Sequence, residues 1–192
     1  MTDRIVVGIT GASGIAYGIT ALKLLRSLGV ETHVIMSRSA QVTLAYETSL
    51  GVADVRELAD VWYSNDDIGA AISSGSFAVR GMIVAPCSIK TLSEIATGIT
   101  GSLMSRAADV MLKERRRLVL MVRETPLHAG HLKSMLAATE AGAIICPPVP
   151  AFYAKPESID DIVQHSVGRV LDLFGLDAGV VRRWRDDAGS AR

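Results

Sequence analysis

The sequence predicts a doubly wound α/β fold, in which a mostly parallel, Rossmann-like sheet lies between two layers of helices. Short apolar runs alternate along the chain with amphipathic segments of helix length, the order that produces parallel strands joined by right-handed crossovers. These runs contain few polar residues, as expected for strands buried on both faces. The 192 residues are 49% hydrophobic and show no break in composition, so we expect residues 1–192 to form one domain.

The predicted strands are short runs rich in Val, Ile, Leu or Met. In chain order they occupy residues 5–9, 33–36, 82–85, 118–122 and 143–145. The amphipathic segments predict helices at residues 15–28, 39–49, 88–97, 102–116, 126–141 and 158–174, the last of which opens a C-terminal helix and tail from about residue 158. Residues 50–80 are less regular, and the serine-rich stretch at 73–76 predicts a loop.

Composition and charge argue against several classes of function. The chain has 20 basic and 20 acidic residues and a pI near 6.9, so neither nucleic acid nor a membrane surface is expected as a partner. The two cysteines, Cys87 and Cys146, lie far apart without CxxC or Cys/His spacing, which predicts neither a disulfide framework nor a zinc site. The N-terminal apolar stretch is too short for a signal segment or a membrane span. We therefore expect a soluble, cytoplasmic protein.

Small and hydroxyl-bearing residues follow several of the predicted strands. Ligands of such sheets bind beyond the carboxyl ends of the strands, so these positions form the candidate site. In chain order they are the glycine-rich turn at residues 8–14, Ser37-Arg38-Ser39, Pro86-Cys87-Ser88, Arg123-Glu124-Thr125 and Pro147-Pro148. A glycine turn that enters a helix presents backbone N–H groups and the positive end of the helix dipole to an anion.

The glycine turn does not match the common nucleotide motifs. It reads GxxGxxG instead of GxGxxG, Met36-Ser37-Arg38 lacks the acid that binds a ribose, and no GxxxxGK[ST] occurs. Glycines at such a turn also serve strand-to-helix packing alone, and the turn by itself does not decide between the two roles. Together with Ser37 and Ser88 it favours flavin mononucleotide (FMN), whose single phosphate requires neither a second phosphate loop nor a ribose acid.

Nine colinear stretches carry a resemblance to a known family. They are GITGASG (8–14), MSRSAQ (36–41), YET (46–48), SSGSF (73–77), PCSIKTLSEIATG (86–98), RAADVMLKERR (106–116), LVLMVRETPLHAGHL (118–132), PPVPAFY (147–153) and VGRVLD (167–172). From Gly8 to about Trp184 the chain resembles the UbiX-type flavin prenyltransferases. The resemblance implies that a dimethylallyl group from dimethylallyl phosphate is joined to N5 and C6 of reduced FMN. The product, prenylated FMN, would serve a UbiD-type decarboxylase, and the chain would form a large homo-oligomer, a dodecamer, with sites at subunit contacts.

The resemblance also implies roles for individual residues. FMN would be bound by Gly11, Ala12, Ser13, Ser37, Ser88, Ile89, Lys90, Thr91 and Arg123. The phosphate of the donor would be bound by Lys113, Arg123, Tyr153 and Arg169, with Trp184 on the wall of the prenyl pocket. Glu124 would protonate the leaving phosphate, and Ser13 and Glu47 would handle the proton released at N5. Ile68 stands near a position where some members carry an aromatic residue. No metal is expected, because the paired Asp66 and Asp67 stand in no aspartate-rich array.

Each of these assignments has a structural alternative. Lys113 and the three arginines at residues 115–117 could form the cationic last turn of a helix, the interpretation we favour for the arginines only. Glu47 could be an exposed acid at a helix end, Tyr153 a packing residue and Arg169 a solvated one. His128 and His131 are spaced like metal ligands but have no further ligand nearby, and Cys87 is expected to be a small buried residue.

Two other functions compete with prenyl transfer. One is a flavin-dependent cysteine decarboxylase, a group that uses a histidine in its first half and a PxSxNT-like loop. Here that loop reads PCSIKT, and the only histidine of the first half is His33 inside a predicted strand, which argues against this function. The other is a non-catalytic FMN-binding subunit of an aromatic-acid decarboxylase, which would not require the phosphate-binding set.

Overall fold

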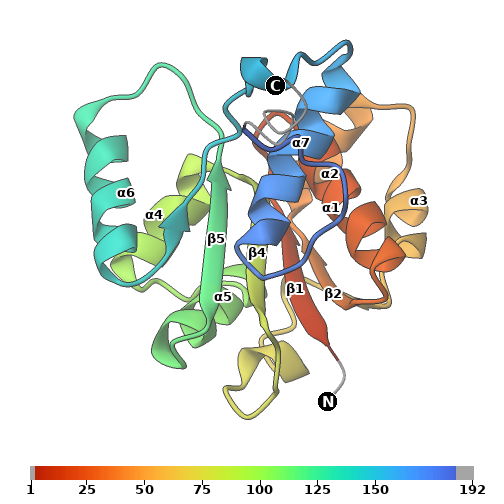
Figure 1. Ribbon diagram of the computed structural model, residues 1–192. Helices are drawn as coiled ribbons and strands as arrows, with labels where there is room; N and C mark the ends of the chain where they lie inside the picture. The colour runs from red at the N-terminus through yellow and green to blue at the C-terminus, as the bar shows by residue number, and fades with distance from the viewer. Residues whose placement is uncertain (1–2, 185–192) are drawn as a thin grey trace.

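The computed structural model describes residues 3–184, and these residues form a six-stranded sheet with helices on both faces (Figure 1). The strands are β1 (Arg4–Ile9), β2 (Glu31–Met36), β3 (Val61–Tyr63), β4 (Gly81–Cys87), β5 (Arg117–Val122) and β6 (Ile144–Ile145). They pair in parallel, in the order β3-β2-β1-β4-β5-β6. The predicted doubly wound α/β fold is confirmed.

The helices divide between the two faces of the sheet. They are α1 (Ile15–Ser27), α2 (Arg38–Glu47), α3 (Val52–Glu57), α4 (Ile89–Thr97), α5 (Leu103–Lys113), α6 (Ala129–Glu140) and α7 (Ile159–Asp172), with short 3-10 turns at Ala71–Ser73 and Phe152–Ala154. One core cluster joins the sheet to α1, α2, α3 and α7, and the other joins it to α4, α5 and α6. Figure 1 shows α7 in front of the sheet and α4 and α5 behind it.

Serine side chains begin four of the helices. Ser37, Ser88, Ser102 and Ser158 each accept a hydrogen bond from a backbone N–H of the first turn of α2, α4, α5 and α7. Such caps satisfy N–H groups that have no partner within the helix, and each stabilises its helix by about 1 kcal/mol. Two of these capped ends, those of α2 and α4, follow β2 and β4 directly and so lie at the carboxyl edge of the sheet.

Most element boundaries agree with the sequence prediction, but two elements were missed. Both, α3 and β3, lie in the stretch at 50–80 that looked irregular. Strand β3 has only three residues, all half-buried, and it exists because it pairs with β2. A strand this short has no periodicity that sequence inspection detects. In the serine-rich stretch at 73–76, Ser73 ends the 3-10 turn and residues 74–76 form an irregular turn, in agreement with the predicted loop.

The prediction that the arginines at 115–117 form the last turn of a helix is wrong. Helix α5 ends at Lys113, and Arg115 has a φ of 56°, which reverses the chain. Arg116 then donates hydrogen bonds to the carbonyl oxygens of Gly75 and Phe77, and Arg117 opens β5. Arg116 and Arg117 therefore hold neighbouring segments at the amino edge of the sheet, and none of the three arginines lies in the last turn of α5.

Helix α1 lies unusually close to the sheet at Gly18. A Cβ added at this position would lie 2.5 Å from the carbonyl oxygen of Ala85 in β4. Because both Gly18 and Ala85 are buried, the close approach fixes the height of α1 above β1 and β4. It thereby fixes the place at which the glycine turn enters α1.

Within residues 3–184, no helix combines the length and the apolar character needed to cross a bilayer.

Replacing Gly18 with alanine should lower the free energy of unfolding by about 1–3 kcal/mol, because the new methyl group meets backbone that cannot move without disturbing the core. Urea denaturation measures the change. Gly101→Ala is the matched control, since its Cβ would meet no atom within 4 Å, and its effect should stay within about 0.5 kcal/mol. Equal stability of the two variants would contradict the close packing of α1.

Candidate functional site

The candidate site lies where the strand order reverses, between the carboxyl ends of β1 and β4. Thr10, which follows β1, is 1% exposed. Its hydroxyl donates to the carbonyl oxygen of Pro86 at 2.7 Å and accepts from the N–H of Ser88 at 2.8 Å. This bridge places the glycine turn before α1 beside the turn that opens α4. Sequence inspection did not single out Thr10, although a hydroxyl between a buried strand and a glycine turn was a usable signal.

The glycine turn is shaped by close contacts with α2. A Cβ on Gly11 would lie 2.5 Å from the Cβ and Oγ of Ser39, so a side chain is excluded there. Gly14 has a φ of 101°, in the left-handed region that glycine adopts without strain. Thr43 of α2 donates to the carbonyl oxygen of Gly11. The glycines therefore serve packing between α1 and α2 and also leave the backbone of the turn open to a ligand.

Glu47 reaches from the end of α2 to the start of α1. Its carboxylate accepts hydrogen bonds from the N–H groups of Gly14 and Ile15 at 2.9 Å. Partial burial raises the pKa of this carboxyl, but hydrogen bonds from the Ser13 side chain and from these N–H groups, with the charge of Arg123, hold it below its usual value. Glu47 and Ser13 therefore form a pair, and Glu47 is an anion at neutral pH. Glu47 is an exposed acid at the end of α2, as the structural alternative predicts, but its carboxylate is bonded to the start of α1.

The two capping serines also face this crevice. Ser37 Oγ accepts from the N–H of Ala40 at 3.1 Å and lies 3.0 Å from Ser39 Oγ. Ser88 Oγ accepts from the N–H of Thr91 and donates to its Oγ1 at 3.2 Å. The N-terminal ends of α1, α2 and α4 thus meet at the ends of three adjacent strands. The N–H groups and hydroxyls at the starts of α2 and α4 suit a phosphate monoester, whereas the first N–H groups of α1 are bonded to Glu47. Ile89 and Lys90 lie in the first turn of α4.

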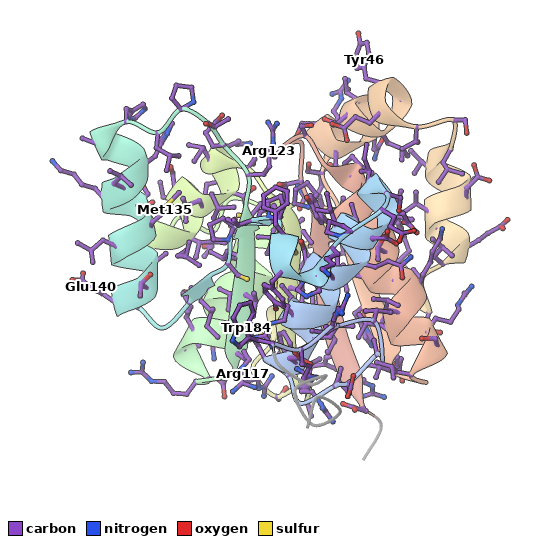
Figure 2. The ribbon with its side chains drawn as sticks, turned by 45° about the horizontal axis from the view of Figure 1, so that its top comes forward. Tyr46, Arg117, Arg123, Met135, Glu140 and Trp184 are labelled. Atoms are coloured by element: carbon purple, nitrogen blue, oxygen red, sulfur yellow. The ribbon has the colours of Figure 1, made fainter. Side chains whose placement is uncertain are left out.

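Arg123 and Glu124 leave β5 at the same edge. The N–H of Arg123 donates to the carbonyl oxygen of Cys87, and its charge acts on both Tyr17 and Glu47. Burial raises the pKa of Tyr17, and Arg123 opposes this shift. Figure 2 shows Arg123 at the open edge of the molecule, between the α6 side and the α2 side. Glu124 is exposed, and its Oε1 accepts from the N–H of Thr125 at 3.0 Å.

Tyr153 and Arg169 line one cavity of about 180 Å³ at the ends of β5 and β6, together with Met121 and Cys146. The ring of Trp184 meets that of Tyr153 edge to face, with the centroids 5.3 Å apart. Burial raises the pKa of the Cys146 thiol and the charge of Arg169 opposes the rise, in agreement with a guanidinium close to this cavity. Tyr153 packs against the rings of His165 and Trp184, and Arg169 is half-exposed and paired with Asp172, so the geometry alone does not decide between a structural and a binding role.

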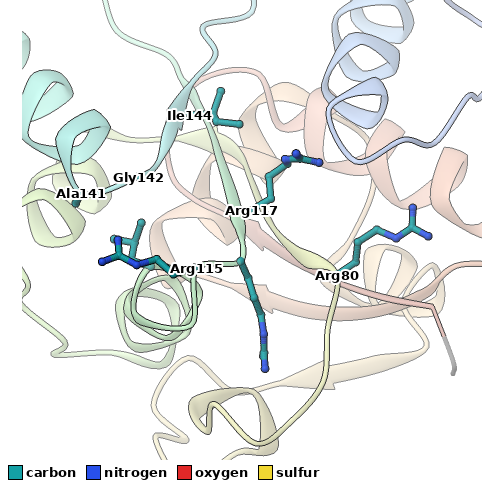
Figure 3. A pocket seen from close by; sticks show the side chains of 8 residues that line it. Arg80, Arg115, Arg117, Ala141, Gly142 and Ile144 are labelled. Carbon is teal, nitrogen blue, oxygen red and sulfur yellow. The ribbon is translucent and has the colours of Figure 1, made fainter.

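The structure does not bring Lys113 to this site. Lys113 ends α5, just before β5 begins, and therefore lies at the amino edge of the sheet, opposite Arg123. Its Nζ pairs with the carboxylate of Glu114. A cavity of about 490 Å³ on the same edge is lined by Arg80, Arg115, Arg116 and Arg117. Figure 3 shows the side chains of Arg115 and Arg117 pointing in opposite directions.

Other predicted residues lie outside the crevice or are inert. Ile68 is 63% exposed in the turn after β3. Cys87 is fully buried, as predicted, and burial raises the pKa of its thiol far above the usual value, so it is not a nucleophile. The rings of His128 and His131 lie 3.6 Å apart, and the side chain of His128 caps α6. Within residues 3–184, no group of three or more His, Cys, Asp or Glu side chains is arranged to hold a metal ion.

Comparisons with known proteins place the chain in a family. Residues 1–171 match the family model described as Flavoprotein. Flavin prenyltransferase UbiX of Thauera aromatica is 56% identical over 181 residues, which cover 94% of this chain and 93% of that protein. The chain belongs to the UbiX flavin prenyltransferase family.

Solved structures of UbiX proteins share this fold closely. AnUbiX (PadA1), in complex with FMN and dimethylallyl pyrophosphate, superposes with a TM-score of 0.94 at 56% identity, over 96% of this chain and 98% of that one. The dodecameric FMN-dependent UbiX-like decarboxylase from Escherichia coli O157:H7 superposes with a TM-score of 0.92 at 50% identity, over 94% and 98%. The resemblance to the UbiX family seen in the sequence is confirmed.

The burial and hydrogen bonding of His33 argue further against a cysteine decarboxylase. It lies in β2 and is 3% exposed. Its Nδ1 is 2.9 Å from the Tyr63 hydroxyl and its Nε2 is 2.9 Å from Glu31 Oε1. Both ring nitrogens are therefore engaged, near the amino end of the strand, and this UbiX-family chain has no other histidine in its first half.

Replacing Ser37 with alanine should lower the amount of flavin retained by the purified protein, because the variant loses a hydroxyl at the crevice and the cap of α2. The measurement is flavin absorbance per mole of protein, with the thermal midpoint as a check on folding. Ser27→Ala is the matched control, since that hydroxyl bonds the Leu24 carbonyl oxygen at the other end of α1. A Ser37 variant as yellow as the control would contradict the assignment.

Proposed function

We propose that this chain is a flavin prenyltransferase that joins a dimethylallyl group from dimethylallyl phosphate to N5 and C6 of reduced FMN. Phosphate leaves, and prenylated FMN passes to a UbiD-type decarboxylase. The observation that carries this proposal is the near full-length similarity, 56% identical with a TM-score of 0.94, to AnUbiX in complex with FMN and dimethylallyl pyrophosphate. The geometry of the crevice agrees with it. Two free thiols, Cys87 and Cys146, fit a cytoplasmic location.

FMN would lie across the switch point, with its phosphate at the N-terminal turns. Gly11, Ala12 and Ser13 would contribute the glycine turn, Ser37 the cap of α2, and Arg123 a cation. The N-terminal turn of α4 would contribute Ser88, Ile89, Lys90 and Thr91. The fit rests on the absence of a side chain at Gly11, the N-terminal ends of α2 and α4, and the hydroxyls beside them. Reduced flavin, when bound, supplies the nucleophilic N5.

The donor phosphate would be held by Arg123, Tyr153 and Arg169. Guanidinium groups and a phenol bind phosphate oxygens through charge-assisted hydrogen bonds and stabilise the charge that develops as the C–O bond breaks. Trp184, edge to face with Tyr153, would close the wall of the prenyl pocket.

Lys113 would reach a phosphate only from another copy of the chain. It lies at the edge of the sheet opposite Arg123, so one chain cannot supply both to one ligand. A homo-oligomer with sites at subunit contacts would resolve this separation. Support comes from the UbiX-like relative from Escherichia coli O157:H7, which is dodecameric.

Protons would be moved by three residues. Glu124, fixed at the end of β5 by its bond to the Thr125 N–H, would protonate the leaving phosphate. Glu47 is already anionic and bonded to Ser13, so this pair would accept the protons released when bonds form at N5 and C6.

Mass spectrometry of the flavin tests the function. The protein is incubated without oxygen with reduced FMN and dimethylallyl phosphate, and in parallel with the diphosphate. A flavin heavier by one C5H8 unit is the expected product. Bound but unmodified FMN with both donors would favour a binding subunit without prenyl-transfer activity.

Glu124→Gln should slow C–O cleavage by about 10²–10⁴-fold while FMN still binds, because an amide cannot act as the general acid. Single-turnover formation of modified flavin measures the step. Glu140→Gln is the matched control, since Glu140 is exposed at the end of α6 and points away from Arg123 (Figure 2). Turnover equal to that of the control would remove Glu124 from the mechanism.

A further inference from the structure

The last segment that the structure describes lies along α7, beside the cavity of Tyr153 and Arg169. We call residues 179–184 the C-terminal strap. A Cβ on Gly168 would lie 2.6 Å from Cγ2 of Val181 and 2.7 Å from Cγ2 of Val180, so the strap packs directly on the helix. His165 is 7% exposed, and its Nε2 is 3.3 Å from the carbonyl oxygen of Arg182. The strap is therefore seated at successive turns of α7.

The strongest attachment of the strap is a fork of hydrogen bonds at Asp172. Arg183 Nη1 lies 2.8 Å from Asp172 Oδ2, and Nη2 lies 2.9 Å from Oδ1. Arg169, the proposed phosphate ligand, donates from Nη1 to the same Oδ2 at 2.5 Å. One carboxylate thus bridges two guanidinium groups, one on the site helix and one on the strap. The Asp172 side chain is only 14% exposed, against 50% for Arg169.

The charges of this trio bear directly on phosphate binding. Two guanidiniums and one carboxylate leave a net charge of +1, whereas Arg169 and Asp172 alone would leave none. Within residues 3–184, Arg183 also lies 3.6 Å from Asp177, which is 70% exposed, so solvent screens that charge. Hydrogen bonds from Arg183, the largest cause, and from Arg169 hold the pKa of Asp172 below its usual value although burial opposes this. Asp172 therefore stays ionised and needs a partner at neutral pH.

We propose that Arg183 is a positioning residue for the donor phosphate: it engages and neutralises Asp172, so that Arg169 remains available to bind the anion. Asp172 then fixes the direction of Arg169 without cancelling its charge. In the absence of Arg183, the semi-buried carboxylate would compete with the phosphate for Arg169 and would repel it. This inference rests on the proposed function, because it takes the phosphate of a prenyl donor as the ligand of Arg169.

A purely structural role for Arg183 makes a different prediction. If the fork only anchors the strap and Trp184, then replacing Asp172, Arg183 or both should weaken phosphate binding to a similar degree. If the fork neutralises Asp172, removing both partners should restore binding, because a neutral amide in place of the carboxylate neither repels the phosphate nor retains Arg169. The two roles are separated by a double-mutant cycle.

The experiment measures the dissociation constants of dimethylallyl phosphate and of inorganic phosphate by calorimetry on the FMN-loaded protein. Arg183→Gln should raise both dissociation constants by about tenfold, the effect expected for the loss of one charge-assisted contact. The KM for the donor should rise similarly, with kcat within about threefold of the original. Arg183→Lys keeps the charge, so both dissociation constants should stay within about threefold of those of the original protein. Asp172→Asn combined with Arg183→Gln should return both constants to within about threefold of the original protein.

Controls separate this inference from the proposed function. Arg56→Gln removes the same charge from an exposed position on α3 and should leave both constants unchanged within error. Flavin content and thermal midpoint verify that each variant folds. A double variant as weak as Arg183→Gln would overturn the neutralising role while leaving the proposed function intact. Arg169→Ala should weaken the binding of both probes, and unchanged affinity in that variant would overturn both this inference and the assignment of Arg169.

Discussion

The junction between β1 and β4 is the constraint on which the site depends. Helix α1 follows β1 onto one face of the sheet, and α4 follows β4 onto the other, so a crevice opens between their N-terminal turns. The buried hydroxyl of Thr10 binds both sides of this crevice, through the carbonyl oxygen of Pro86 and the N–H of Ser88. It sets the separation of the two turns, and with it the width of the crevice.

Two carboxylates near the proposed ligand residues have their negative charge compensated locally. Glu47 is bonded to the backbone of the glycine turn and lies within the field of Arg123. Asp172 is held between Arg169 and Arg183. In both places the negative charge is compensated locally by N–H groups or guanidiniums. Under the proposed function, these carboxylates would serve proton transfer and positioning without adding uncompensated negative charge beside the phosphate.

The position of Lys113 bears on whether one chain can supply all the proposed phosphate ligands. Arg123 and Lys113 are only ten residues apart along the chain, but β5 runs between them and carries them to opposite edges of the sheet. A strand of this length separates its ends by about 17–20 Å. Under the proposed function, a second copy of the chain would supply this cation, so oligomerisation would contribute to the site itself and not only to stability.

Local patterns determined most of the fold. The apolar runs located five strands, the glycine turn and strand ends located the crevice, and family motifs supplied Arg123, Tyr153 and Arg169. What the sequence did not reveal has a common cause. Strand β3 depends on pairing with β2, Thr10 on the neighbouring β4, and the bridge of Arg183 to Asp172 on the return of the strap to α7. Periodicity and capping are properties of consecutive residues, whereas these contacts join residues whose distance is decided only when the sheet and its helices assemble.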